Sequence, residues 1–576
     1  MLLPYRRVSM QTCSSGTLLI QPRAGDGIQN SMNIPQKSRA SLDGQRFQVV
    51  VIGGGINGVA IARECARAKR RTLLLEQNDF GSGTTSRSTR IIHGGLRYLE
   101  FGEIGLVRQS LRERQQLLRE RPHLVHTVQF LLALGENSRR SAMKIRMGLW
   151  LYRRLGGKTR VADGAADRAR FERLLDSGQR WSIFNFEDAQ CEFPERLVAE
   201  WLVAAADSGA VVRNYAQVLA VDVAYGRAKG LLFRDLLTGT EQRIEAGWII
   251  NATGPWVDRL CQRSAINTHG PMIGGVRGSH IVLPRFAGAP DAAVFTEAVD
   301  GRPIFLIPWN EQVMVGTTEV PDQSDPSKTQ PSAEEIEYLL NSLHALFPGA
   351  KVFANDVHYA FAGVRPLPFM RGRNPSAITR RHFLHDHGKQ GVQHMISVIG
   401  GKLTTAAELA RQCARKIRIP VAEPKGLATL AEGEIAATMD DWIAEISGLS
   451  GISENAAEAI VTWHGKRTLA VAQLARSGAQ MRATLCPHSE HIVAEAVDAF
   501  QHEYAVTLGD VLLRRVPVAM AACWTEECSR VAASRIAAAL GWSKGEEMSE
   551  LEALERERSA FLVKPSTARA DSEVPG

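Results

Sequence analysis

The stretch FQVVVIGGGINGVAIARECARAKRRTLLLE, residues 47–76, determines the fold of the chain around it. Its apolar start predicts a strand, its middle predicts a helix that opens at the glycines, and TLLLE predicts a second strand. Gly53, Gly55 and Gly58 have the GxGxxG spacing of a dinucleotide-binding βαβ unit. Glu76 ends the second strand, where a carboxylate can accept hydrogen bonds from ribose hydroxyls and repels a 2′-phosphate. The stretch therefore predicts a cofactor of the NAD or FAD type.

Two later segments favour the flavin. NATGPW (251–256) and IGGKLTT (399–405) each end an apolar strand on glycine, as expected where the chain returns to the same sheet. In IGGKLTT a helix follows directly. Its N-terminus can face the pyrimidine end of an isoalloxazine ring, where negative charge accumulates on reduction. We therefore expect FAD.

The bulk composition excludes other classes. At 576 residues, with 44% hydrophobic and 23% charged residues, the chain is expected to form two or three globular domains. The longest apolar stretch, residues 49–62, is too short to span a bilayer. The net charge of +8 comes without a nucleic-acid-binding signature, and an anionic substrate, cofactor or membrane surface explains it equally well. The eight cysteines lack CxxC pairs, which argues against a zinc site and a disulfide framework, so no metal is expected.

The chain divides into four parts by pattern. Residues 1–45 lack periodicity and are expected to be a disordered leader, a transit peptide or the result of a start called before Met32. Residues 46–425 form the oxidoreductase region, with cofactor-binding segments at about 46–125, 190–265 and 370–420. Interleaved segments, mainly the strand-rich 266–370, are expected to bind substrate. Residues 431–562 are Ala-rich and helical, and 563–576 form a polar tail.

From residue 47 to residue 562 the chain resembles the FAD-dependent, aerobic-type glycerol-3-phosphate dehydrogenases. The ordered set of motifs carries the resemblance: VVVIGGGINGVAIA, TTSRSTRIIHGGLRYLE (84–100), NATGPWV, GSHIVLPR (278–285), VGTTEV (315–320), AGVRPL (362–367), IGGKLTT and TLGDVLLRR (507–515). The resemblance implies an α/β fold: a glutathione-reductase-like FAD-binding domain, a β-rich D-amino-acid-oxidase-like substrate domain and a C-terminal α-helical domain.

The resemblance also implies a substrate site. Six residues are expected to line it: His93, Arg97, Tyr98, Thr317, Arg365 and Lys402. A phosphate dianion favours bidentate guanidinium recognition, so Arg365 and Arg97 are the expected clamps. His93 is the expected acceptor of the hydroxyl proton, and Lys402 can neutralise the developing anion or hold a substrate oxygen. His93, Arg365 and Lys402 are thus the expected catalytic residues.

A larger set is expected to bind FAD. Its members come from the glycine loop, the segments after it and the two later glycine-ending strands. They are Gly53, Gly54, Gly55, Asn57, Gly58, Glu76, Thr84, Ser86, Ser88, His93, Gly94, Gly95, Val218, Thr253, Gly254, Gly401, Lys402, Leu403 and Thr404.

The chain departs from the family pattern at four places. Arg90 and Arg277 stand where lysine is common, Glu319 replaces an aspartate, and the segment 187–198 is less rich in aspartate. The expected reaction is oxidation of sn-glycerol 3-phosphate to dihydroxyacetone phosphate, with electrons passed to a quinone. The alternatives are an oxidase using oxygen, a flavin enzyme for another 2-hydroxy acid or amine, and a non-catalytic flavin-binding redox sensor or membrane scaffold.

The resemblance further implies a cytoplasmic enzyme held peripherally on the inner face of the cytoplasmic membrane, and it is compatible with a homodimer. A basic segment at residues 138–160 is the candidate contact with anionic lipid, because cations there surround apolar residues and Trp150. A helix packed into the core with a solvated basic side is the alternative.

Overall fold

The first of two sheets contains β1, the strand that leads into the glycine motif. This computed structural model describes residues 39–156, 165–373, 375–421 and 439–563. Most of the expected leader (1–45) and polar tail (563–576) lies outside these residues, as do Lys158 and Arg160 of the basic segment. The first sheet has the strand order β16-β17-β9-β1-β2-β6, with β8 paired to β9 and β7 to β8.

Strand β1 lies between two parallel neighbours, β2 and β9, and its side chains from Val49 onward are buried. Burial on both faces explains its unbroken apolar sequence. Helices α1, α5 and α8 pack together on one face. The elements are β1 (Arg46–Ile52), α1 (Ile56–Arg67), β2 (Thr72–Leu75), α5 (Pro194–Asp207), β6 (Val211–Arg213), β7 (Ala216–Ala224), β8 (Arg227–Asp235), β9 (Glu241–Asn251), α6 (Val257–Arg263), β16 (Phe383–Asp386), β17 (Met395–Ile399) and α8 (Ala406–Lys416).

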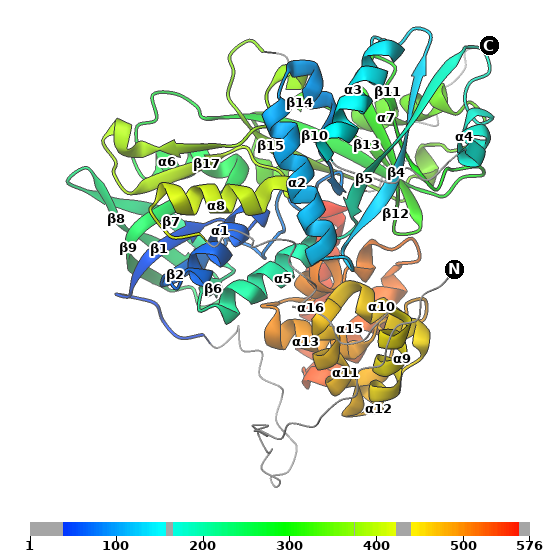
Figure 1. The fold of residues 1–576 in the computed structure, drawn as a ribbon. Coiled ribbons are helices and arrows are strands. Elements are labelled where there is room, and N and C mark those ends of the chain that lie inside the picture. Colours follow the sequence, from blue (N-terminus) through cyan, green and yellow to red (C-terminus); the bar gives the residue numbers. More distant parts are fainter. Residues whose placement is uncertain (1–38, 157–164, 374, 422–438, 564–576) are drawn as a thin grey trace, which may run out of the picture.

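A second sheet lies beside the first (Figure 1). Its order is β14-β10-β13-β12-β11-β4-β5-β3, and β15 pairs with β10. Helix α7 packs on one face, where Ser332 and Glu335 form the capping box that begins it. Its elements are β3 (Ile91–Ile92), β4 (Val125–Gly135), β5 (Trp181–Cys191), β10 (Ile273–Pro284), β11 (Ala293–Glu297), β12 (Pro303–Trp309), β13 (Gln312–Gly316), β14 (Val320–Pro321), α7 (Ala333–Leu346) and β15 (Tyr359–Pro368).

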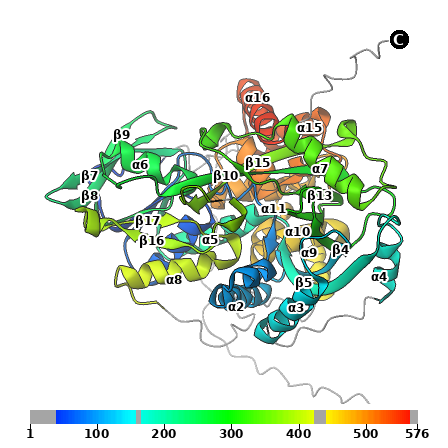
Figure 2. The same cartoon turned by 90° about the horizontal axis from the view of Figure 1, so that it is seen from above.

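Three helices lie beside strands β4 and β5 of the second sheet, as the view from above shows (Figure 2). They are α2 (Ile104–Glu120), α3 (Ala142–Gly156) and α4 (Ala165–Glu172). The 3-10 helix Leu96–Phe101 leads into α2 and also contacts α3. Leu149 of α3 and Leu111 of α2 share a core with Phe130 and Phe186 of the sheet. The segment 138–156 is therefore partly a core-packed helix.

The C-terminal helices form a separate bundle below both sheets in Figure 1. They are α9 (Met439–Ser450), α10 (Glu454–His464), α11 (Thr468–Arg476), α12 (Ala479–Arg482), α13 (Val493–His502), α14 (Leu508–Asp510), α15 (Glu526–Leu540) and α16 (Lys544–Phe561). The predicted α/β class with a β-rich second domain and a helical C-terminal domain is confirmed. Within the described ranges, no helix is both long and apolar enough to cross a bilayer.

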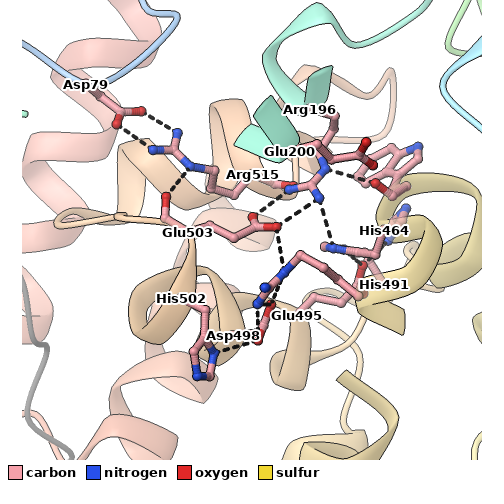
Figure 3. A network of polar contacts seen from close by, with 12 residues as sticks. Asp79, Arg196, Glu200, His464, His491, Glu495, Asp498, His502, Glu503 and Arg515 are labelled. Atoms are coloured by element: carbon pink, nitrogen blue, oxygen red, sulfur yellow. Dashed lines mark hydrogen bonds and ion pairs between the residues drawn. The ribbon is translucent and has the colours of Figure 1, made fainter. Parts of the chain in front are cut away.

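Buried ion pairs join the helical domain to the first sheet (Figure 3). Arg515 donates to both carboxylate oxygens of Asp79, at 2.6 and 2.7 Å, and Asp79 follows β2. Arg196 of α5 binds Glu503 at 2.6 and 3.0 Å. The helical domain therefore holds the loop that follows Glu76. Glu76 and residues after this loop are among those predicted to bind the cofactor.

Candidate active site

A cavity of about 670 Å³ receives residues from both sheets. The glycine loop, the segment after β2 and the loops after β9 and β17 contribute from the first sheet. Phe305, Thr317 and Arg365 contribute from the second. Such a position at the carboxyl ends of parallel strands is typical of nucleotide-binding α/β folds.

The three motif glycines have different structural roles beside this cavity. Gly53 has φ +104°, and a Cβ there would lie 2.5 Å from the carbonyl oxygen of Ala252. A Cβ on Gly58 would lie 1.8 Å from the carbonyl oxygen of Gly53, so this residue sets the close approach of helix to strand. A Cβ on Gly55 meets only Thr85, at 3.4 Å, and would point toward open cavity. Gly55 is thus the position where a ligand can approach the backbone.

The start of α1 fits an anionic cofactor. Gly55 is the N-cap residue and provides no side-chain cap. The Ile56 N–H donates to Oγ1 of Thr85 at 3.1 Å, and the N–H groups that follow it in the first turn can face phosphate oxygens. Asn57 lines the cavity, and its buried Oδ1 has no hydrogen-bond partner within the described part of the chain. Glu76 also lines the cavity while accepting from the Gly54 N–H at 2.6 Å and the Asn78 N–H at 2.9 Å. The loop therefore fits FAD, with Glu76 at the expected ribose position.

Most predicted cofactor residues line the cavity. These are Gly53, Gly55, Asn57, Glu76, Thr84, Ser88, His93, Gly95, Val218, Thr253, Gly254, Gly401, Lys402 and Leu403. The structure does not bring Gly54, Gly58, Ser86, Gly94 and Thr404 into the lining.

Three of these five residues support the cavity wall through hydrogen bonds. Ser86 donates to the carbonyl of Gly81, and Thr404 accepts from the His93 N–H at 3.2 Å. The Gly94 N–H donates to Asp188, a carboxylate that also receives Arg114 and Tyr152. The backbone N–H groups of His93 and of the next residue, Gly94, are therefore both held by side chains from other segments.

All six predicted substrate residues line the same cavity: His93, Arg97, Tyr98, Thr317, Arg365 and Lys402. Arg365 donates to Oγ1 of Thr317 at 2.8 Å and to the carbonyl of Thr318 at 3.3 Å. Burial, and Arg380 after it, lowers the pKa of Arg365 to about 10, so the guanidinium remains charged at neutral pH.

The lining also contains Arg380, which the sequence did not single out. Its guanidinium binds Oε1 of Glu319 at 2.6 Å, and the same oxygen lies 3.7 Å from Arg97. Glu319 therefore holds two cations at the cavity wall. The pair Arg380–Arg381 before β16 was the only signal, and a basic dipeptide in a loop is too common to indicate a site.

His93 and Lys402 carry the strongest electrostatic perturbations of the six. Burial, and then Lys402, lowers the pKa of His93 to about 3, so its imidazole is neutral at physiological pH. Burial lowers the pKa of Lys402 to about 7, and Asp188 and Glu103 oppose this shift. Nζ of Lys402 donates to Ser110 Oγ at 2.7 Å and lies 4.5 Å from the centre of the Tyr98 ring.

Besides Glu319, the two arginines that depart from the family pattern also have structural partners. Arg90 makes a bidentate ion pair with Glu195 at 2.9 and 3.0 Å, in the buried wall of the cavity. Arg277 lies outside the lining and pairs with Glu335 at 2.9 Å. Arginine at these places therefore joins elements together through its planar fork.

Comparison with known proteins agrees with this geometry. The family model described as FAD dependent oxidoreductase matches residues 48–415, and that of the C-terminal domain of alpha-glycerophosphate oxidase matches residues 392–547. A glycerol-3-phosphate dehydrogenase of Synechocystis sp. is 35% identical over 493 residues, 82% of this chain and 89% of that protein. A D-erythritol 1-phosphate dehydrogenase of Brucella abortus is also 35% identical, over 64% of this chain and 73% of its own length.

A solved structure shares the fold. The glycerol-3-phosphate dehydrogenase of Bacillus halodurans, complexed with FAD, superposes with a TM-score of 0.70 at 23% identity, covering 92% of this chain and 97% of that one. The chain therefore belongs to the FAD-dependent oxidoreductase family, together with the glycerol-3-phosphate dehydrogenases that it matches over most of its length.

Proposed function

We propose that the protein oxidises sn-glycerol 3-phosphate to dihydroxyacetone phosphate in this cavity and passes the electrons to a quinone. The convergence of Arg365, Arg97 and Arg380 on a cavity that also contains His93 and Lys402 carries the proposal. Guanidinium groups bind a phosphate dianion through paired, charge-assisted hydrogen bonds. The relatives named after phosphorylated polyols support a substrate of this kind.

The proton of the substrate hydroxyl requires an acceptor, and we assign it to His93. Its neutral imidazole can accept a proton, although a pKa of about 3 makes it a weak base in the substrate-free cavity. A bound phosphate dianion opposes the effect of the neighbouring cations and raises this pKa. Substrate binding thus strengthens the base that it needs.

FAD, when bound, supplies the acceptor for the hydride that leaves the carbinol carbon. Lys402 stabilises negative charge that develops beside it, because its ammonium group is buried in the cavity wall. Thr317 orients Arg365 through the hydrogen bond at 2.8 Å, which keeps the guanidinium directed at the cavity.

Anaerobic reduction tests the reaction. The purified yellow protein is mixed with glycerol 3-phosphate, D-erythritol 1-phosphate or glycerol without oxygen, and flavin absorbance is followed. We expect rapid bleaching by glycerol 3-phosphate and much slower bleaching by glycerol. Preferential bleaching by the erythritol phosphate would reassign the substrate, and no bleaching by any of them would favour the redox sensor.

The electron acceptor is tested by turnover. Steady-state oxidation of glycerol 3-phosphate is compared with a soluble quinone analogue and with oxygen as acceptors. We expect the quinone analogue to support the higher rate. Stoichiometric hydrogen peroxide and equal rates without the quinone would identify an oxidase.

We also propose that α3 places the protein on anionic lipid. Met143, Met147 and Trp150 follow one another at helical spacing, and their side chains are 60–65% exposed. Phe101 and Ile104, at the junction with α2, are about half exposed and belong to elements that contact α3. Apolar side chains of this kind insert into the interfacial region of a bilayer.

Basic side chains flank this apolar row. Lys144, Arg146 and Arg154 of α3 are exposed, and each cation near an anionic surface contributes about 1 kcal/mol. We expect sedimentation with phosphatidylglycerol vesicles at low salt and little with phosphatidylcholine. Trp150→Ala should weaken it, whereas Tyr225→Ala, which removes an aromatic ring that is 97% exposed on the β7–β8 hairpin, should not. Binding that ignores lipid charge and salt would contradict the proposal.

A further inference from the structure

Three side chains of metal-ligand type converge in the C-terminal helical domain, outside the cavity lining. The Sγ atoms of Cys486 and Cys528 and a ring nitrogen of His488 all lie within 4.8 Å of one another. Sγ of Cys528 is 3.7 Å from Nδ1 of His488. The two cysteines are buried and the histidine is exposed. Among the described residues, no other group of at least three Cys, His, Asp or Glu residues meets this criterion.

The distances suit tetrahedral zinc. Bonds of about 2.3 Å to sulfur and about 2.0–2.1 Å to nitrogen place S and N ligands about 3.6 Å apart at the tetrahedral angle. The 3.7 Å between Cys528 and His488 agrees with this separation. Thiolate with imidazole is also a ligand set that selects zinc over calcium or magnesium.

The backbone holds the ligands from two directions. Cys486 and His488 lie in a tight turn, where the Ser489 N–H donates to the carbonyl of Cys486 at 3.3 Å. Bridge pairing of Thr484 with Ile492 closes the base of this loop. A short turn of this kind directs two side chains separated by one residue toward a common point.

Cys528 comes from the other direction, in the first turn of α15. Its N–H donates to Oγ1 of the N-cap residue Thr525 at 3.3 Å. A thiolate in this position is favoured by the helix dipole. Cys523, an exposed thiol, lies just before the same helix, and its carbonyl accepts from Sγ of Cys528 at 3.5 Å.

We propose that Cys486, His488 and Cys528 bind a structural zinc ion, with Cys523 as the fourth ligand. Each cysteine bound as thiolate releases its proton on coordination, and no oxidant or reductant is required. The sequence did not indicate this site because His488 and Cys528 are 40 residues apart, without a CxxC pair.

The ion would fix a junction between domains. The segment just before Cys523 contains Met520, whose carbonyl accepts from Tyr359 at 2.7 Å and from Gln312 and Asn310 at 3.2 Å. These three residues belong to β15 of the second sheet and to the turn and strand around β13. Zinc would therefore join the turn at Cys486 to a segment that contacts the substrate-binding sheet.

Metal content tests the proposal directly. The full-length holoenzyme is purified without metal-affinity chromatography from zinc-supplemented cells and analysed by inductively coupled plasma mass spectrometry. We expect one zinc per chain, and cobalt substitution should produce thiolate-to-cobalt charge-transfer bands. His488→Ala and Cys528→Ala should lose the metal. Their matched controls, His502→Ala and Cys413→Ala, should retain it, because neither residue belongs to the cluster.

Exposed His488 is the decisive position, since its substitution leaves the core packing unchanged even if Cys528→Ala fails to fold. Zinc affinity of this variant is measured by competition with a chromophoric chelator. Wild-type protein without zinc, or His488→Ala with unchanged affinity, would overturn the site. A disulfide between Cys486 and Cys528, detected by thiol titration under denaturing conditions, would overturn it as well. Unchanged affinity in Cys523→Ser would remove Cys523 from the ligand set.

Discussion

Oε1 of Glu319 lies 2.6 Å from a guanidinium nitrogen of Arg380 and 3.7 Å from one of Arg97. One carboxylate thus positions two cations in a cavity that Arg365 also lines. Three guanidiniums and one carboxylate leave a net charge of +2 among these four groups, which complements a phosphate dianion. The wall is therefore suited to a phosphorylated substrate, with Glu319 organising the cations.

Removal of Arg365 should impair the phosphorylated substrate selectively. Each charge-assisted hydrogen bond contributes roughly 1.5–3 kcal/mol, and Arg97 and Arg380 compensate in part. We expect Arg365→Ala to cost about 2–4 kcal/mol in transition-state binding, a loss of roughly 30- to 1000-fold in kcat/KM. The measurement is kcat/KM for glycerol 3-phosphate and for glycerol, with flavin content checked.

Lysine at position 365 provides the matched control, because an ammonium group keeps the charge but not the planar fork. It should recover only part of the loss. Equal losses for both substrates at full flavin occupancy would show that Arg365 does not bind phosphate.

Removal of Arg380 should also weaken the phosphorylated substrate. Arg380→Ala deletes one cation and releases Glu319, so the net charge of the four-residue group falls from +2 to +1. We expect kcat/KM for glycerol 3-phosphate to fall by roughly 10- to 100-fold, about 1.4–2.8 kcal/mol. Full activity of Arg380→Ala would assign this arginine a purely structural role.

Gly55→Val should give a folded protein without flavin. The Cβ at this position meets protein only at 3.4 Å, so a larger side chain extends into the cavity at the first turn of α1. We expect near-native circular dichroism and loss of the flavin absorbance. Gly58→Ala is the contrasting variant, because its Cβ would meet the carbonyl of Gly53 at 1.8 Å and should impair folding itself. A fully yellow Gly55→Val protein would contradict the loop assignment.

Local chemistry explains which features the sequence could predict. Some features depend on residues that are close in sequence, so their patterns are visible in the chain. They are the turn at Gly53, the close approach of Gly58 to the carbonyl of Gly53, and the capping box of Ser332 with Glu335. The helix expected to open at the glycines is α1, which begins at Ile56, directly after Gly55.

Long-range pairing explains what was missed. Arg380 joins the cavity because Glu319, 61 residues earlier, attracts it from the second sheet. Likewise, the thiol of Cys528 meets His488 only after α13 and α15 have packed. Neither pairing has a fixed spacing, so single-sequence reasoning has no period or motif by which to find it.

Glu495 should make the helical domain sensitive to acid. Its carboxylate accepts from His464 at 2.8 Å and His491 at 2.9 Å. Burial alone would raise the pKa of Glu495, but the two histidines outweigh it and lower this pKa to about 2. The contribution to stability is therefore complete above about pH 4.5 and is lost as the pH falls toward 2, about 2–4 kcal/mol.

Urea unfolding between pH 7 and pH 3, followed by tryptophan fluorescence, measures this contribution. Glu495→Gln should be less stable than wild type at pH 7, and the difference should shrink toward pH 3. Glu527→Gln, which changes an exposed carboxylate, should behave like wild type throughout. A difference that does not depend on pH would show that Glu495 acts through packing alone.

Lys402 should set the alkaline limit of activity. Burial lowers its pKa to about 7, and the ammonium form, present below that pH, carries the charge that stabilises negative charge in the cavity. We therefore expect kcat/KM to be highest near or below neutrality and to fall about tenfold per pH unit above the apparent pKa. The dianionic substrate stabilises the ammonium form, so the corresponding pKa in the kcat profile should be higher. His93 cannot cause this limb, since its pKa of about 3 lies far below it.

Substitution of Lys402 by arginine isolates its titration. A guanidinium stays charged across the accessible range, so Lys402→Arg should lose the alkaline limb even if its maximal rate is lower. Lys402→Met, which is never charged, should be slow at every pH and also lack the limb. The acidic limb should persist in both variants, because it reports protonation of the substrate phosphate, whose second pKa is about 6. An alkaline limb that remains unchanged in Lys402→Arg would assign the titration to another group and remove the proposed charge role of Lys402.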